Sequence, residues 1–216
     1  MKTDDLIAAL TRDLRPAMPL PSPVRRLGGW LAACPLFLGA GLLVWGVRDD
    51  APAFLARGVQ MQSMVFAVVT AGAAALAALL LAIPAARGVA TATMTAFAAV
   101  AVWMASLVSQ IAVTGASLAE ALSWPYSICL VKVATMAAIP AAALWAMLRR
   151  AAALSPAWTT GMAALAAAAV GALGTQLACP NASPAHVLLG HVGAMSGLSA
   201  FAAVTARFAA RGTPRR

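Results

Sequence analysis

The sequence predicts an all-α membrane protein, a bundle of six transmembrane helices preceded by a short cytoplasmic amphipathic helix. Two observations support this fold class. First, the chain is 62% hydrophobic and only 10% charged, whereas soluble domains carry about 25% charged residues. Second, its mean hydropathy is +0.88, and apolar runs of the roughly 20 residues that a spanning helix needs recur along the chain. The 216 residues leave no room for a large soluble domain beside these runs.

The six apolar runs follow a polar head and are separated by loops that hold proline, glycine and charged residues. They cover residues 28–47, 61–83, 91–113, 127–148, 158–178 and 186–206. The runs are rich in alanine and glycine, so close approach of helix backbones is expected to hold them together in lipid. We therefore divide the chain into a head (1–27), a transmembrane bundle (28–206) and a basic tail (207–216).

The head predicts a short helix over residues 3–15. Apolar side chains recur there at helical spacing and form one stripe, and two aspartates in the first turn face the positive end of the helix dipole. Such a short helix is marginal alone in water and needs a surface to bind. Its three aspartates favour a protein groove over a membrane surface. The predicted partner-binding residues are Asp4, Asp5, Leu6, Ile7, Leu10 and Leu14.

The basic residues predict the orientation of the bundle, because cytoplasmic loops carry an excess of Lys and Arg. With the N-terminus inside, twelve of the fifteen basic residues lie on the inner side. These twelve are Lys2, Arg12, Arg15, Arg25, Arg26, Arg87, Arg149, Arg150, Arg207, Arg211, Arg215 and Arg216. We expect a multi-pass protein of the bacterial inner membrane with both termini in the cytoplasm. The net charge of +9 then reflects orientation among membrane lipids, and we predict no direct nucleic-acid binding.

The stretch "LACPNASPAHVLLGHV", residues 177–192, gathers most of the soft chemistry of the chain. It holds both histidines and one of the three cysteines, and it should face outward. Cys179 ends the fifth run, and Cys129 lies at the same side of the fourth. Two interpretations of this pair stay open: a redox-switchable or metal-binding thiol pair, or two small apolar fillers. Lys132, three residues after Cys129, either favours a thiolate or marks the membrane interface.

The histidines are expected to differ in role. A spacing of five places His186 and His191 about 140° apart on an α-helix, so they should not share a face. We expect His186 to join Cys129 and Cys179 in sensing, and these three residues to form a site for a soft metal ion such as zinc, cadmium or copper. His191 is expected to present its polar tip to water. Cys34 lies near the opposite membrane face and is interpreted as filler.

Three functional classes fit a small polytopic chain of this kind. A small metal or solute transporter needs polar groups along a pathway, and no span has Asp, Glu, Arg or His at its centre. A membrane thiol oxidoreductase needs a CxxC motif, which the sequence lacks. A membrane-tethered regulator needs only a docking helix and a receiving site. We therefore expect no enzyme and no resident cofactor, with at most a transient soft metal ion.

Three features together resemble a known family: "TDDLIAAL" near the N-terminus, Arg25-Arg26 before the first of six spans, and "CP" followed by proline and two histidines from Cys179 onward. They are similar to the NrsF-type (negative regulator of sigma F) membrane proteins, bacterial anti-sigma factors for extracytoplasmic-function sigma factors. The similarity covers essentially the whole chain. It implies that the head sequesters such a sigma factor. It also implies a stress response in which Cys129 and Cys179 take part in sensing an oxidant or a heavy metal.

Overall fold

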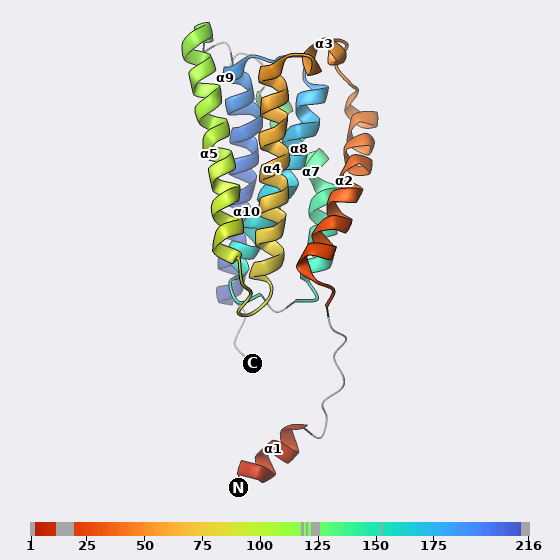
Figure 1. Ribbon diagram of the computed structural model, residues 1–216, viewed down its shortest axis with the longest axis vertical. Helices are drawn as coiled ribbons and strands as arrows, with labels where there is room; N and C mark the ends of the chain where they lie inside the picture. The colour runs from red at the N-terminus through yellow and green to blue at the C-terminus, as the bar shows by residue number, and fades with distance from the viewer. Residues whose placement is uncertain are drawn as a thin grey trace.

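The chain folds into a bundle of long helices that run side by side (Figure 1). The computed structural model describes residues 3–11, 20–117, 119, 121, 126–151 and 153–212. Within these residues every regular element is a helix, and six helices are long and apolar enough to cross a membrane. The predicted all-helical fold and its six long apolar helices are therefore confirmed.

The helices follow the predicted order closely. They are α1 (Thr3–Thr11), α2 (Pro23–Trp45), α3 (Ala51–Leu55), α4 (Gly58–Leu81), α5 (Val89–Thr114), α7 (Tyr126–Leu148), α8 (Pro156–Ala178), α9 (Pro184–His186), the π-helix η1 (Val187–Gly193) and α10 (Ala194–Gly212). The largest differences lie at the end of α10, which reaches Gly212 instead of residue 206, and at the start of α2. α2 begins at Pro23 because Ser22 caps it, accepting a hydrogen bond from Arg25 N at 3.3 Å, and because proline suits the first helical position.

The bundle has two ends, which differ in what they carry (Figure 1). At one end, here named the terminal end, α2 begins and α10 finishes. At the other, the loop end, α2 leads into α3, and α8 leads into α9. The even number of long helices places the start of the first and the finish of the last at the same end.

α8 is the central helix of the bundle. In its most apolar window 78% of the residues are buried, compared with 11% for α2. Its glycines permit this, since a Cβ at Gly171 would clash with the Val133 carbonyl oxygen of α7 and lie 3.1 Å from Ala137 N. A Cβ at Gly161 would lie 3.0 Å from Ala203 Cβ of α10. Small residues thus allow α7 and α10 to approach the backbone of α8.

α2 lies at the edge of the bundle and is attached to α7 by polar contacts. Trp30 Nε1 donates to Pro140 O at 3.1 Å, near the middle of α7. Trp45 Nε1 donates to Thr135 Oγ1 at 2.9 Å, nearer the loop end. Arg26 donates to Met147 O at the terminal end. These hydrogen bonds hold α2 against α7 along most of its length although little of its surface is buried.

The replacement Gly171→Ala should destabilise the bundle, because the new methyl group meets the α7 backbone, which cannot rotate away. Overpacking of this kind costs about 1–3 kcal/mol. The matched control is Gly72→Ala in α4, where no atom lies within 4 Å of the added Cβ. There the change should be neutral or stabilising by about 0.5–1 kcal/mol, because alanine favours a helix interior over glycine. Thermal unfolding of both variants in detergent micelles checks this, and equal melting temperatures would contradict the close approach.

Candidate functional site

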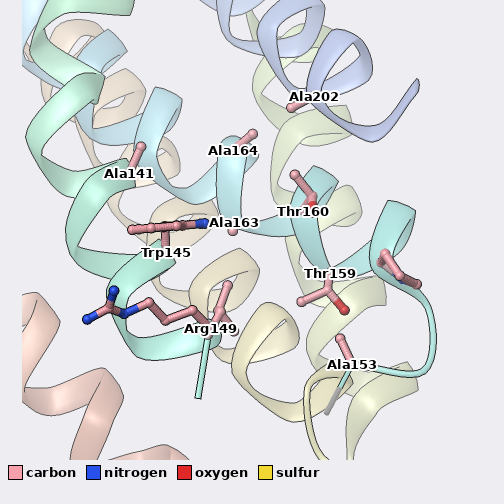
Figure 2. A pocket seen from close by; sticks show the side chains of 11 residues that line it. Ala141, Trp145, Arg149, Ala153, Thr159, Thr160, Ala163, Ala164 and Ala202 are labelled. Carbon is pink, nitrogen blue, oxygen red and sulfur yellow. The ribbon is translucent and has the colours of Figure 1, made fainter. Parts of the chain in front are cut away.

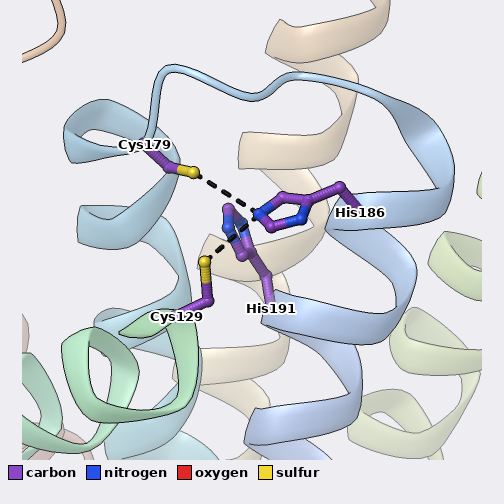
Figure 3. A group of neighbouring side chains, drawn as sticks. All are labelled: Cys129, Cys179, His186 and His191. Carbon is purple, nitrogen blue, oxygen red and sulfur yellow. Dashed lines mark hydrogen bonds between the residues drawn. The ribbon is translucent and has the colours of Figure 1, made fainter. Parts of the chain in front are cut away.

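Four side chains meet at the loop end of the bundle: Cys129, Cys179, His186 and His191 (Figure 3). One ligand atom from each lies within 4.8 Å of all the others. His186 Nε2 is 3.2 Å from Cys129 Sγ and 3.5 Å from Cys179 Sγ. All four side chains are buried, and both cysteines are free thiols. The structure therefore brings together the three predicted site residues and adds His191; these four are named the Cys/His cluster.

Three segments supply the Cys/His cluster. Cys129 comes from the first turns of α7, where it is 1% exposed. Cys179 follows the last residue of α8 in an extended conformation, with φ −104° and ψ 123°. Both histidines come from the helix that returns into the bundle, His186 from α9 and His191 from η1. Figure 3 shows the four side chains converging from these elements.

The expectation that the two histidines lie on different faces was wrong. It assumed an α-helix, whereas Val187–Gly193 forms a π-helix. A π-helix is hydrogen-bonded from residue i to i+5, so side chains five apart are brought nearly into register. The two imidazole centroids are 5.5 Å apart with an interplanar angle of 79°. His191 is 0% exposed, so it also does not present its tip to water.

Gly190 keeps space open beside the Cys/His cluster. A Cβ at this position would lie 3.4 Å from Cys129 Cβ and 3.5 Å from His186 Nε2. Nε2 is the atom that faces both sulfur atoms. A larger side chain at Gly190 would therefore occupy the space beside the His186 imidazole, which lies between the two sulfur atoms.

The donor set fits a soft metal ion. Two thiols and two imidazoles are the ligands of closed tetrahedral zinc sites. Ligand atoms at 2.0–2.3 Å from zinc lie about 3.3–3.8 Å apart in a tetrahedron, close to the spacing in the Cys/His cluster. Both ring nitrogens of His191 are buried without a hydrogen-bond partner among the described residues. Burying a polar group without a partner is costly, and a coordination bond would remove that cost.

Two cations hold the backbone around Cys179. Arg48, which follows α2, donates from Nη1 to Cys179 O at 2.9 Å and from Nη2 to Pro180 O at 3.2 Å. Lys132 of α7 donates from Nζ to Ala178 O at 2.9 Å. The last carbonyls of a helix lack partners within the helix and favour positive charge. Arg48 and Lys132, named the carbonyl clamp, supply hydrogen-bond donors and positive charge at the end of α8.

The sequence interpretation missed Arg48, which it counted only as a basic residue of the outer side. Its side chain folds back over the end of α8 and is also paired with Asp50. Its guanidinium lies over the Phe54 ring, 4.1 Å from the centroid. In the sequence, only Asp50, two residues after Arg48, indicates that this arginine could form an ion pair. Lys132 lies on the same face of α7 as Cys129, but its ammonium points to the Ala178 carbonyl.

Two groups between the long helices have shifted pKa values because of these contacts. The hydrogen bond from Arg48 lowers the pKa of Asp50, so this carboxylate keeps its charge opposite the guanidinium. Hydrogen bonding from Cys129 lowers the pKa of the Cys179 thiol; burial acts in the opposite direction, and hydrogen bonding from His186 adds to the lowering.

The remaining predicted residues lie away from the Cys/His cluster. Cys34 is buried in α2 and is not part of it. In α1 the side chains of Asp4, Asp5, Leu6 and Ile7 are exposed, with Leu6 at 43% and Ile7 at 54%. Leu10 lies within α1, and Leu14 lies outside the described residues. The apolar stripe is thus uncovered at Leu6 and Ile7.

A groove of about 380 Å³ lies at the terminal end between α7, α8 and α10 (Figure 2). Trp145 and Arg149 of α7 form one side of it, and Thr159 and Thr160 of α8 lie on the other. Its described lining contains no cysteine, histidine or carboxylate. Its threonine hydroxyls therefore have no general base beside them among the described lining residues, and the Cys/His cluster is the stronger candidate site.

Comparison with known proteins finds one family that matches most of the chain. The model of one protein family, described as negative regulator of sigma F, matches residues 10–211. No curated protein and no solved structure matches this chain. The match covers the bundle, the Cys/His cluster and the end of the head. The chain therefore belongs to the NrsF family, the negative regulators of sigma F.

Proposed function

We propose that this protein is a membrane-bound anti-sigma factor that sequesters an extracytoplasmic-function sigma factor and releases it when the Cys/His cluster receives a signal. The family supports a sigma factor as partner. The observation that carries the proposal is the meeting of Cys129, Cys179 and both histidines in one buried cluster at the loop end. The protein acts as a regulator in this proposal and catalyses no reaction.

Two features support opposite placement of the head and the Cys/His cluster. The head joins α2 at the terminal end, and the Cys/His cluster lies at the loop end (Figure 1). Basic residues concentrate in the segments of the terminal end, which the positive-inside rule assigns to the cytoplasm. The head then meets a cytoplasmic sigma factor, while the Cys/His cluster lies on the side of the inner membrane that faces outward.

The donor set supports a soft metal ion as the signal. Two sulfur and two imidazole ligands match zinc, cadmium and copper(I) better than hard cations, which prefer oxygen. The energy is sufficient, because switching a partner from almost all bound to almost all free needs about 5.5 kcal/mol. Zinc bound by four such ligands contributes about 10–16 kcal/mol in small zinc-finger peptides.

A second candidate signal is a two-electron oxidant. Cys129 and Cys179 are both free thiols with sulfur atoms within 4.8 Å of each other. Oxidation would join the two sulfur atoms in a disulfide, and the oxidant would accept two electrons and the two thiol protons. This chemistry needs no histidine, so histidine variants distinguish the two signals.

At the head, the uncovered stripe of α1 supports docking into the sigma factor. Leu6 and Ile7 are exposed and next to the acidic first turn. A helix of nine residues has little stability of its own in water. A groove in the partner that covers the stripe would stabilise the helix and hold the sigma factor at the membrane.

The first prediction concerns metal binding by the purified full-length protein in detergent micelles. It should bind one Co²⁺ per chain, with the visible absorption of a tetrahedral site and thiolate charge-transfer bands. His191→Ala and His186→Ala should each weaken binding by more than the roughly 10–100-fold of an outer-shell change, because each removes a ligand. Cys34→Ser is the matched control and should bind like the wild type. Undiminished affinity in His191→Ala would exclude the four-ligand site.

The second prediction concerns the head. Leu6→Asp and Leu10→Asp place a charge on the docking stripe and should release the sigma factor. Loss of a buried leucine contact costs about 2–5 kcal/mol, which is roughly a thirtyfold or larger loss of affinity. Ala8→Asp adds the same charge on the opposite face and is the control. The readout is basal transcription of the genes that deletion of this protein derepresses, at matched protein abundance. Full repression by Leu10→Asp would place the docking surface elsewhere.

The third prediction concerns the response itself. Cys129→Ser and Cys179→Ser should each abolish induction by cadmium while basal repression stays intact, because the head is unchanged. Cys34→Ser should respond normally. His191→Ala should lose the response to cadmium but keep a response to a thiol oxidant, if that second signal operates. Normal induction in the Cys129→Ser, Cys179→Ser double variant would contradict sensing by these thiols and would show that both cysteines serve only in packing.

A further inference from the structure

Both cysteines of the Cys/His cluster belong to segments that are hydrogen-bonded to α2 and its C-terminal extension. On the side of Cys179, Arg48 holds the carbonyls of residues 179 and 180 with its guanidinium. Its backbone N–H also donates to Leu177 O at 2.9 Å. The end of α8 is thus attached to the chain only three residues beyond Trp45, the last residue of α2.

On the side of Cys129, α7 is attached to α2 along its length. Trp45, Trp30 and Arg26 donate to Thr135, Pro140 and Met147, respectively. α2 is therefore attached to α7, which carries Cys129, through its own side chains. Through Arg48, which follows it, α2 is linked to the backbone of Cys179 at the end of α8. A change in the distance between Cys129 and Cys179 therefore displaces α7 and the end of α8, the two segments to which α2 is hydrogen-bonded, relative to each other.

α2 is also the helix best placed to move and to report. Only 11% of its most apolar window is buried, so few packing contacts resist a shift. It begins at Pro23, within residues 1–27 of the head, so the head is continuous with its first turn. Helix shifts of about 1–2 Å are a common form of signal transfer between distant sites.

We propose that α2 transmits the signal to the head and that Arg48 is the positioning residue that couples Cys179 to α2. This inference rests on the proposed function, because it requires that the Cys/His cluster receives the signal. Drawing the four ligand atoms together moves the end of α8 relative to α7. Arg48 transfers this movement to the loop end of α2, and the hydrogen bonds from Trp30 and Arg26 transfer it to the terminal end. The head then changes its position at the membrane.

Arg48 is suited to this role by its burial and its bonds. Its side chain is 3% exposed and is fixed by Asp50 on one side and by the Phe54 ring on the other. Its planar guanidinium donates to two successive carbonyls at once, which the single ammonium of a lysine cannot do with the same geometry. The link between Cys179 and α2 is therefore short and stiff.

The experiment compares Arg48→Gln with the wild type and with Arg57→Gln, which removes an exposed cation at the same end. Hydrogen exchange of the full-length protein in detergent micelles is measured with and without Zn²⁺ at saturation. In the wild type, zinc should change exchange both in the Cys/His cluster and in the first turns of α2. In Arg48→Gln the change should stay at the Cys/His cluster. Maximal induction of the derepressed genes by zinc should fall about tenfold, within the usual range of allosteric coupling, while Arg57→Gln behaves like the wild type.

Maximal induction separates coupling from mere support of the site. If Arg48→Gln only needs more zinc but reaches the wild-type maximum, Arg48 supports the Cys/His cluster and the inference is overturned. An unchanged exchange response in α2 overturns it as well. Arg48→Lys, which keeps one donor group, should recover part of the maximum.

A second variant covers the case in which Arg48→Gln does not accumulate. Trp30→Phe keeps the aromatic packing of α2 but removes the hydrogen bond to Pro140 O. It should bind zinc normally and show a smaller exchange response in the first turns of α2; a full response there overturns transmission through α2. A wild-type protein that neither binds nor responds to zinc refutes the metal signal of the proposed function, whereas a normal response in Arg48→Gln refutes the coupling alone.

Discussion

The structure depends on how closely α8 can be approached by its neighbours. Glycines at three places remove the side chains that would keep other helices away: Gly161 faces α10, Gly171 faces the backbone of α7, and Gly174 faces Met136 and Leu38. In lipid, helices gain little from hiding apolar surface and associate through packing and hydrogen bonds. The close contact of α7 and α8 therefore sets the separation of their loop-end residues, and these include Cys129 and Cys179.

A buried group of four titratable side chains is an unusual feature of such an apolar bundle. It is tolerated because the surrounding polar groups are paired with one another. The carbonyls at the end of α8 accept from Lys132 and Arg48, and Arg48 is balanced by Asp50. His191 differs from these groups, since neither of its ring nitrogens has a hydrogen-bond partner among the described residues. A buried polar group without a partner needs an explanation, and a bound ion is one.

The six long apolar helices were predictable because hydropathy and length alone determine them, and the structure shifts their ends by at most six residues. The approach of Cys129 to Cys179 was not predictable, because 50 residues separate the two cysteines. Their distance depends on the contact of Gly171 with α7. The place of His191 in the Cys/His cluster was missed because the prediction assumed the spacing of an α-helix. Arg48 was missed because a basic residue after a span is usually explained by orientation, and only the folded chain shows its side chain over the end of α8.

The π-helix has a consequence for how the site is encoded. In a regular α-helix, two residues four apart share a face. Across α9 and η1, His186 and His191 share a face although they are five apart. One residue inserted into an α-helix and absorbed by a wider turn converts the first spacing into the second. A chain one residue shorter between its histidines, with an unbroken α-helix, would present the same pair to the same two sulfur atoms. The wider turn also absorbs the insertion locally, so α10 keeps the face that packs against Gly161 of α8.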